Sequence, residues 1–172
     1  MSPELKLQPF RVDAAVEREI RRHGEETYPH ECCGALVGSV GRATATVALP
    51  NMTEEGPRRR FLVRPSDYRL AEQKAAEIGG ELLGFYHSHP DHPERPSQYD
   101  LDHAWPTFAY IIVAVAGAAA SPGRSAEENA AGLPRRSAEG AEAGEAAKAG
   151  DMTVWFLKED RSTFEEGELN GN

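Results

Sequence analysis

The sequence predicts a single domain of the α/β class. Its 172 residues are an ordinary length for one domain. Two segments with helical periodicity alternate with several short apolar segments that are typical of strands. Hydrophobic residues make up 40% of the chain and charged residues 27%. This balance is typical of soluble domains whose core is large enough to fold without disulfides or a structural metal.

The predicted elements begin with a helix over residues 12–23, where Val12, Val16 and Ile20 form one apolar stripe and Gly24 marks the expected end. A second helix is predicted to begin with Ser66 or Asp67 as its N-cap and to end at residues 79–80. Apolar or alternating segments predict strands over residues 33–40, 43–49, 61–63, 82–86, 108–115 and 152–157.

Residues 117–150 differ in composition from the rest of the chain. Alanine and glycine fill 18 of these 34 positions, and two prolines interrupt them. Such a segment cannot bury enough apolar surface to offset the entropy of ordering it. We expect a disordered insertion within the domain, with helix formers over residues 138–149, and expect the polar residues 165–172 to fray.

Charge and cysteine usage narrow the classes of function. The chain has 19 Lys and Arg against 28 Asp and Glu, a formal charge of −9, which argues against nucleic-acid binding. No apolar segment is long enough to span a membrane, and the first residues lack the apolar core of a signal peptide. The adjacent Cys32 and Cys33 are expected to be buried free thiols. These observations predict a cytoplasmic protein.

A histidine pair marks the candidate site. His87 and His89 follow an apolar segment at positions i and i+2, so they would point to the same face of a strand. Prolines stiffen the following loop, and Ser97 is expected to cap a helix that begins at Gln98. Asp100, on the first turn of that helix, would add a carboxylate. Two histidines and one carboxylate are a ligand set that suits Zn²⁺ and leaves a position open for water.

Metal-dependent hydrolysis also requires a general base. Glu31 is a candidate because it precedes an apolar strand that is expected to lie in the same sheet as the histidines. Spacing alone does not separate Glu31 from Glu25, Glu26 or Glu81.

The pattern resembles the signature of the JAMM/MPN metallopeptidases, also called the JAB or MPN+ family. That signature is an upstream glutamate followed by His-x-His-x7-Ser-x2-Asp, and residues 87–100 fit it without a gap. The segment Tyr28-Pro-His-Glu31-Cys-Cys-Gly34 is similar to the family's Pro-x-Glu-x-Cys-Gly element. The resemblance covers residues 12–115 and resumes at residue 152, and it points to the small prokaryotic members.

The resemblance implies a role for each matched residue. His87, His89 and Asp100 would ligate Zn²⁺, Glu31 would be the general acid/base for the zinc-bound water, and Ser97 would hydrogen-bond the oxyanion. The implied fold is a mixed, strongly bent sheet flanked by helices, similar to cytidine deaminases. The implied reaction is hydrolysis of an amide or isopeptide bond after the C-terminal glycine of a ubiquitin-like protein.

Among such reactions we favour the release of cysteine or another adduct from a sulfur-carrier protein with a Gly-Gly end, whose extended tail would pair with an edge strand near the zinc. The alternatives are a general or cell-wall peptidase of the same superfamily and a non-catalytic MPN scaffold. The insertion at residues 117–150 is also considered as a segment that docks a partner.

Several other polar residues near the motif have simpler explanations. His92, Asp102 and His103 are interpreted as exposed side chains rather than partners of the metal ligands. Cys32, Cys33, Trp105 and Trp155 are interpreted as packing residues.

Overall fold

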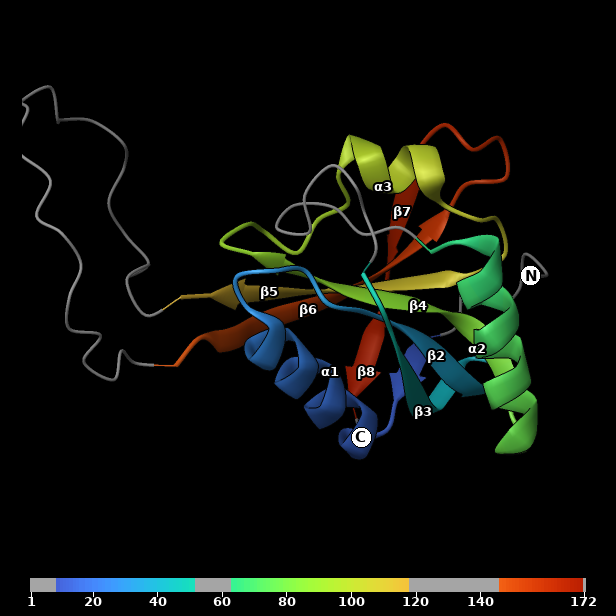
Figure 1. Ribbon diagram of the computed structural model, residues 1–172. Coiled ribbons are helices and arrows are strands. Elements are labelled where there is room, and N and C mark those ends of the chain that lie inside the picture. Colours follow the sequence, from blue (N-terminus) through green and yellow to red (C-terminus); the bar gives the residue numbers. More distant parts are fainter. Residues whose placement is uncertain (1–8, 52–62, 118–145, 172) are drawn as a thin grey trace, which may run out of the picture.

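The computed structural model describes residues 9–51, 63–117 and 146–171. Along the chain, its elements are β1 Phe10–Val12, α1 Ala14–Thr27, β2 Cys33–Ser39, β3 Arg42–Leu49, α2 Pro65–Glu77, β4 Glu81–Pro90, α3 Gln98–His103, β5 Ala109–Ala116, β6 Lys148–Leu157, β7 Phe164–Gly167 and β8 Leu169–Gly171. Helices are interspersed among the strands, although within these described ranges β2 and β3, and β5 to β8, follow one another without a helix between them (Figure 1).

The eight strands form one mixed sheet in the order β7-β6-β5-β4-β2-β3-β1-β8. Strands β4 and β5 pair in parallel, as do β1 with β3 and β1 with β8, whereas the remaining neighbours are antiparallel. The strand β4, which carries the two histidines, lies between β2 and β5 and is therefore hydrogen-bonded on both sides.

Two apolar clusters cover the two faces of the sheet. On one face, Val16 and Ile20 of α1 pack with Tyr86, Ile111 and Val113. On the other face, Ala71 of α2 packs with Phe85 and Tyr110. The neighbours Phe85 and Tyr86 thus belong to opposite faces, as alternation along a strand requires. The mixed sheet flanked by helices is confirmed.

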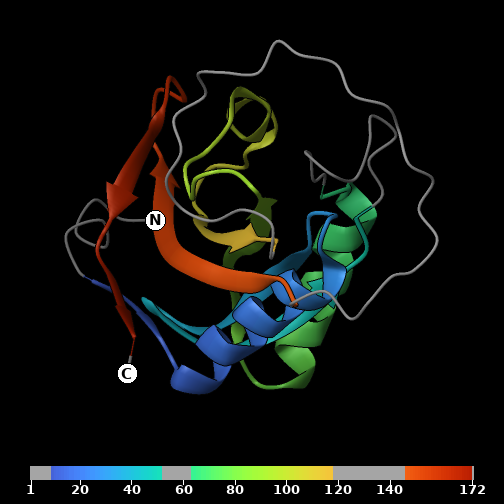
Figure 2. The same ribbon diagram turned by 90° about the vertical axis from the view of Figure 1, so that its left-hand side faces the viewer.

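The sheet is strongly bent. Phe10 of β1 and Phe156 of β6 are separated by four strands in the sheet order, yet their ring centroids lie 6.3 Å apart with the rings edge to face. Figure 2 shows the curved path of β6, drawn in orange. Bending brings distant strands together around α1, so that one cluster includes residues of β1, β2, β4, β5 and β6.

Helix α1 differs from its predicted bounds at both ends. Val12 lies in β1, and the helix continues past Gly24 to Thr27. A Cβ atom at Gly24 would lie 2.9 Å from Cγ2 of Val115 and 3.4 Å from Cβ of Ser88. The glycine therefore allows α1 to approach the sheet closely and does not end the helix.

The start of α2 also corrects the sequence-based prediction. The helix begins at Pro65 with Arg64 as its N-cap, and the Asp67 carboxylate accepts a hydrogen bond from the Arg64 backbone N–H at 3.1 Å. Neither Ser66 nor Asp67 is the cap. Of the strand predicted over residues 61–63, Val63 is not in a strand and the other two positions lie outside the described residues.

Both predictions of disorder in the C-terminal third are wrong where the structure describes the chain. Strand β6 begins at Lys148 rather than residue 152, with Ala149 paired to Val115. Residues 118–145 of the predicted insertion lie outside the described residues. The expected frayed end instead forms strands, because β7 pairs with β6 and β8 pairs with β1.

No helix within residues 9–51, 63–117 and 146–171 is long and apolar enough to cross a membrane.

Candidate metal centre

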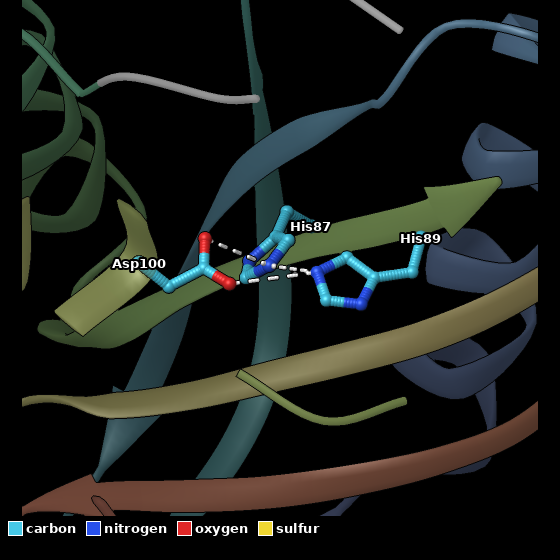
Figure 3. Close-up of side chains that lie close together, drawn as sticks. All are labelled: His87, His89 and Asp100. Carbon is cyan, nitrogen blue, oxygen red and sulfur yellow. Dashed lines mark hydrogen bonds and ion pairs between the residues drawn. The ribbon is translucent and has the colours of Figure 1, made fainter. Parts of the chain in front are cut away.

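The centre of the site is formed by two histidines on β4 and one aspartate on α3. His87 and His89 point to the same face of the strand, and their Nε2 atoms lie 3.1 Å apart. Oδ1 of Asp100 lies 3.5 Å from Nε2 of His87, and Oδ2 lies 3.5 Å from Nε2 of His89 (Figure 3). All three side chains are buried, so their polar atoms face one another and not bulk water.

The position of β4 in the sheet fixes the histidines. His87 is paired with Cys33 of β2 and with Ile112 of β5, and His89 is paired with Ala114 of β5. Strand β5 comes very close at Gly84, where a Cβ atom would lie 1.8 Å from the carbonyl oxygen of Ala109. Glycine is therefore required there for β4 to pair with β5.

The orientation of His89 is fixed by the loop that follows it. Its Nδ1 atom lies 2.7 Å from the carbonyl oxygen of Pro93. Because a carbonyl oxygen only accepts hydrogen bonds, Nδ1 carries a proton, and in the neutral imidazole Nε2 is left with its lone pair. The Nε2 atom is the one that faces His87 and Asp100.

Asp100 is positioned by a reciprocal cap at the start of α3. The hydroxyl of Ser97 accepts a hydrogen bond from the Asp100 backbone N–H at 3.1 Å. In return, the Ser97 backbone N–H and hydroxyl donate to Oδ2 of Asp100 at 2.6 and 2.8 Å. This arrangement is the capping box that the Ser-x-x-Asp spacing encodes. It confirms Ser97 as the cap of a helix that begins at Gln98.

The three groups influence one another electrostatically. Burial opposes ionisation of Asp100, but the adjacent His87 and His89 outweigh it and hold the pKa of that carboxyl well below its usual range. Burial lowers the pKa of His87. Burial acts in the same direction on His89, but the Asp100 carboxylate, which accepts a hydrogen bond from Nε2 only when that nitrogen is protonated, and the Pro93 carbonyl outweigh it and raise the pKa of that imidazole.

The geometry of the cluster fits a tetrahedral metal ion. Ligand atoms at about 2.0–2.1 Å from a tetrahedral Zn²⁺ lie about 3.3 Å from one another. The 3.1 Å between the two Nε2 atoms, and the 3.5 Å from each Nε2 to a different oxygen of Asp100, are close to that value. The donor set of two imidazoles and a carboxylate is typical of zinc sites.

Glu31 lies beside this cluster, in the loop between α1 and β2. Its side chain is buried, and within the described part of the chain its Oε2 atom has no hydrogen-bond partner. Burial raises the pKa of the Glu31 carboxyl to about 8, with the His89 charge opposing the shift and the Asp100 charge adding to it. The Asn51 side chain donates to the Glu31 carbonyl oxygen at 3.0 Å and so anchors the backbone.

A cavity of about 450 Å³ connects Glu31 with the metal-ligand cluster. Its walls include candidate catalytic residues and the loop after β4, and the lining residues are Glu31, His89, His92, Pro93, Arg95, Ser97, Gln98 and Tyr99. The volume is typical of a ligand-binding pocket. Since both Glu31 and His89 line it, a bound substrate would lie between the candidate base and the candidate metal ligands.

Sequence reasoning missed the residues that hold the loop between His89 and Ser97. The Thr153 hydroxyl and the Trp155 indole N–H, both on β6, donate to the carbonyl oxygen of Glu94 at 2.5 and 3.3 Å. On the other side of the site, the Tyr28 hydroxyl donates to the Asp91 carboxylate at 2.6 Å. Each contact joins residues about 60 positions apart, and the local sequence pattern around either residue does not predict it.

The remaining residues near the motif lie where the simpler interpretation placed them, with one exception. Asp102 and His103 are exposed, whereas His92 is exposed but lines the cavity. Cys32 and Cys33 are free and buried, in opposite core clusters. Trp105 stacks on Tyr68 with ring centroids 5.1 Å apart.

All five candidate residues are thus brought together from four elements: the loop before β2, strand β4, the turn at Ser97 and helix α3. His87, His89 and Asp100 form the cluster, and Glu31 and Ser97 line the adjoining cavity. The buried Glu31 carboxyl, with its raised pKa, lies beside a group of side chains that could hold a metal. Such a carboxyl is suited to acid–base chemistry on water.

Comparison with known proteins agrees with this geometry. A family profile described as prokaryotic homologs of the JAB domain matches residues 13–128. The match contains all five candidate residues.

Two curated relatives are similar over about half of the chain. One is a desampylase of Haloferax volcanii, 36% identical over 87 residues, which are 49% of this chain and 62% of that protein. The other is the tail tip assembly protein K of Escherichia phage N15, 36% identical over 81 residues, which are 47% of this chain and 30% of that protein. The matched segment therefore spans less than two thirds of either relative.

Among solved structures, a solution structure of a protein from Salinibacter ruber aligns with a TM-score of 0.60 and 32% identity. The alignment covers 94% of this chain and 91% of that one. The overall architecture is therefore shared well beyond the residues of the site.

Proposed function

The chain belongs to the prokaryotic homologues of the JAB domain, and from this membership and the geometry of its site we propose that it is a metal-dependent hydrolase of the isopeptidase type. Its proposed substrate is the amide or isopeptide bond after the C-terminal glycine of a ubiquitin-like protein. The observation that carries the proposal is the placement of Glu31, a buried carboxyl without a hydrogen-bond partner at Oε2 in the described chain, in the same cavity as His89.

We propose Zn²⁺ as the metal, held by Nε2 of His87, Nε2 of His89 and the Asp100 carboxylate. The distances among these atoms and the protonation of His89 at Nδ1 support this assignment. When bound, Zn²⁺ would supply a Lewis acid that polarises the scissile carbonyl and acidifies water near neutral pH.

Glu31 is the proposed general acid/base. It takes one proton from the attacking water as the new carbon–oxygen bond forms, and it delivers that proton to the departing nitrogen as the carbon–nitrogen bond breaks. The products are the carboxylic acid of the terminal glycine, which releases its proton to solvent near neutral pH, and a free amine. Burial raises the pKa of this carboxyl to about 8 in the metal-free chain, and a bound cation would lower it from there, which suits a group that accepts and returns a proton near neutral pH.

Ser97 is proposed to have two roles. It caps α3 and donates to Oδ2 of Asp100 at 2.8 Å, which orients that carboxylate toward the histidines. Ser97 also lines the cavity, and in the proposed reaction its hydroxyl, which has a single proton, would turn from Asp100 to donate to the oxyanion that forms on the substrate carbonyl.

The proposed partner is a ubiquitin-like sulfur carrier that ends in Gly-Gly, from which cysteine or another adduct is released. The similarity to a protein named desampylase supports a substrate of the ubiquitin-like class. The tail could add to β3, since among the described strands β1 pairs with β3 only at Arg42 and Ala43, and β3 ends near Glu31. A cytoplasmic location is part of the proposal, supported by the two free thiols.

A second candidate is a peptidase of the kind that acts on cell walls. This alternative from the sequence analysis stays under test, because one of the matched relatives is a phage protein named tail tip assembly protein K. The two candidates differ in substrate and share the metal site and Glu31.

Hydrolysis assays with a substrate panel test the proposal. The panel contains a ubiquitin-fold carrier extended by one cysteine after Gly-Gly, a carrier joined to a lysine side chain, and cell-wall peptides. We expect zinc-dependent cleavage of a carrier substrate, abolished by a chelator and restored by added zinc. Cleavage of cell-wall peptides alone would favour the second candidate, and cleavage of nothing by the zinc-loaded protein would indicate a non-catalytic scaffold.

A further inference from the structure

The cavity beside Glu31 extends beyond the groups that the proposed reaction uses. Its lining includes His92, Arg95, Gln98 and Tyr99, which belong to the loop after β4 and the first turn of α3. None of these side chains belongs to the metal-ligand cluster. This wall is therefore available to contact the substrate on either side of the scissile bond, at the leaving group or at the carrier tail.

Arg95 is the one permanently charged cation among the residues that line the cavity. Within the part of the chain that the structure describes, the Arg95 guanidinium has neither an ion pair nor a hydrogen bond. Arg11, Arg18 and Arg69 also lack an ion pair within the described residues, so what sets the exposed Arg95 apart is its place in the cavity wall. The whole chain carries a net charge of −9. An unneutralised guanidinium at the mouth of a reactive cavity favours an anionic ligand.

The backbone on both sides of Arg95 is held in place. The carbonyl oxygen of Glu94 accepts hydrogen bonds from Thr153 and Trp155. Two residues after Arg95, Ser97 is fixed by its reciprocal hydrogen bonds with Asp100. The Cα atom of Arg95 is therefore positioned relative to the reactive groups, and less entropy is lost when its side chain binds an anion.

We propose that Arg95 binds the α-carboxylate of a leaving amino acid, so that the site selects a single residue joined through its α-amine to the C-terminal glycine. This inference rests on the proposed function and assigns its leaving group. In such a substrate the carboxylate carbon lies about 2.5 Å from the departing nitrogen, so it enters the cavity together with the scissile bond. Arginine binds carboxylates through two parallel hydrogen bonds.

A lysine side chain joined to the carrier lacks this feature. Its departing nitrogen is followed by four methylene groups, and its own carboxyl is part of a peptide bond. Arg95 would then have no anion to bind next to the scissile bond. The site is thus expected to act as a trimming hydrolase for carriers with one extra residue, and poorly on carriers attached to proteins.

Three probes on one ubiquitin-fold carrier test this inference with the zinc-loaded protein. The first carries one cysteine after Gly-Gly with a free carboxylate, and the second carries the same cysteine as its carboxamide. The third is joined to the side chain of acetyl-lysine amide. Because the first two share the thiol, any binding of that thiol to the metal cancels in their ratio. We expect kcat/KM to be about 10- to 100-fold higher for the acid than for the amide.

The matched variants are Arg95→Gln and Arg69→Gln. Arg69 lies on α2 and does not line the cavity. The acid-to-amide ratio is expected to fall toward one in Arg95→Gln, to recover in part in Arg95→Lys, and to stay at the wild-type value in Arg69→Gln. Product inhibition gives a second readout that does not depend on cleavage of these compounds. Free L-alanine, which has an α-carboxylate, should inhibit, whereas L-alaninamide, which lacks one, should not.

The outcomes separate the inference from the function on which it rests. A wild-type ratio near one, or a ratio that Arg95→Gln leaves unchanged, would overturn the role of Arg95 and leave the proposed hydrolase intact. Cleavage of the lysine-linked probe as fast as the acid would do the same. If no probe were cleaved, the proposed function and this inference would both be rejected.

Discussion

The Nδ1 atom of His89 and the carbonyl oxygen of Pro93 lie 2.7 Å apart. This contact determines which nitrogen of the imidazole is free to bind a metal. The proton on Nδ1 leaves the lone pair of Nε2 facing Asp100 and His87. The same loop then leads to Ser97, which orients Asp100. One short segment therefore orients two of the three candidate ligands.

Replacing His89 with alanine is expected to abolish tight zinc binding. The native protein should hold about one zinc ion per chain, and the His89→Ala variant should bind at least about 100-fold more weakly, because only one imidazole and one carboxylate remain. Elemental analysis after dialysis and titration calorimetry measure this. His92→Ala is the control, because His92 lines the same cavity outside the cluster. Equal loss in both variants, or no zinc uptake by the native chain, would contradict the assignment.

Replacing Glu31 with glutamine is expected to lower kcat by roughly 10²–10⁴-fold, since the amide cannot accept and return a proton. The zinc content should stay at the native value, because Glu31 is outside the ligand cluster. Steady-state kinetics and metal analysis on the same samples measure both. Glu81→Gln, at the exposed start of β4, should keep native kinetics. A Glu31→Gln variant that keeps most of its activity would exclude this residue as the base.

The candidate metal-ligand set was predictable because it is encoded locally. Alternation in a strand places His87 and His89 on one face, and a cap with an acidic residue three positions later places Asp100. Each inference spans only a few residues. The shared face of the histidines and the Ser97 cap are confirmed, and the structure adds reciprocal hydrogen bonds between Ser97 and Asp100 that were not predicted.

Glu31 was not predictable from spacing, because it is 56 positions from His87 and its neighbours include other glutamates. The family resemblance chose it, and in the structure burial distinguishes it, since Glu25, Glu26 and Glu81 are all more exposed. Other misses have the same origin. Gly24 inside α1, the pairing of β8 with β1, and the Trp155–Glu94 contact all depend on segments distant in sequence.

The buried Glu31 carboxyl predicts a pH dependence of stability for the metal-free protein. Its pKa is about 8 in the folded chain against an ordinary 4.5. Between these values the folded state holds a proton that the unfolded state releases, so stability falls as pH rises from about 4.5 to about 8. Relative to Glu31→Gln, the native chain should lose at most about 5 kcal/mol over this range.

Urea unfolding at several pH values, with a chelator present, measures this difference. His87, His89 and Asp100 are common to both proteins, so their own titrations cancel to first order. Added zinc should reduce the pH-dependent difference in stability between the native chain and Glu31→Gln, because a nearby cation favours the ionised carboxylate. Parallel stability curves for the two metal-free proteins would show that the Glu31 carboxyl ionises in the folded state as easily as in water.

The two cysteines are expected to be unreactive in the native protein. Burial raises the pKa of Cys32 to about 11 and that of Cys33 to about 12, so little thiolate is present at pH 8. Alkylation should be at least about 100-fold slower in the native protein than in denaturant, where the thiol pKa returns to about 8.5. Mass spectrometry after timed alkylation distinguishes the two residues. Rapid native labelling of either would contradict the packing role.

Ser97 offers a test that separates positioning from catalysis. The Ser97→Ala variant loses both the helix cap and the hydroxyl, and we expect a loss of about 1 kcal/mol in stability together with a 10²–10³-fold fall in kcat, typical of losing an oxyanion donor. Ser97→Asn retains a capping side chain, so its stability should stay near the native value. If the hydroxyl serves the oxyanion, kcat should fall in both variants.

If the hydroxyl only orients Asp100, Ser97→Ala and Ser97→Asn should differ in kcat and in zinc affinity. Asparagine at position 97 can still accept from the Asp100 backbone N–H and keep the first turn of α3 formed. Asp100 would stay in reach of both histidines, and zinc affinity and kcat should remain near native in Ser97→Asn. A parallel fall of zinc affinity and kcat in Ser97→Ala would then assign the loss to Asp100, because an oxyanion donor has no part in holding the metal.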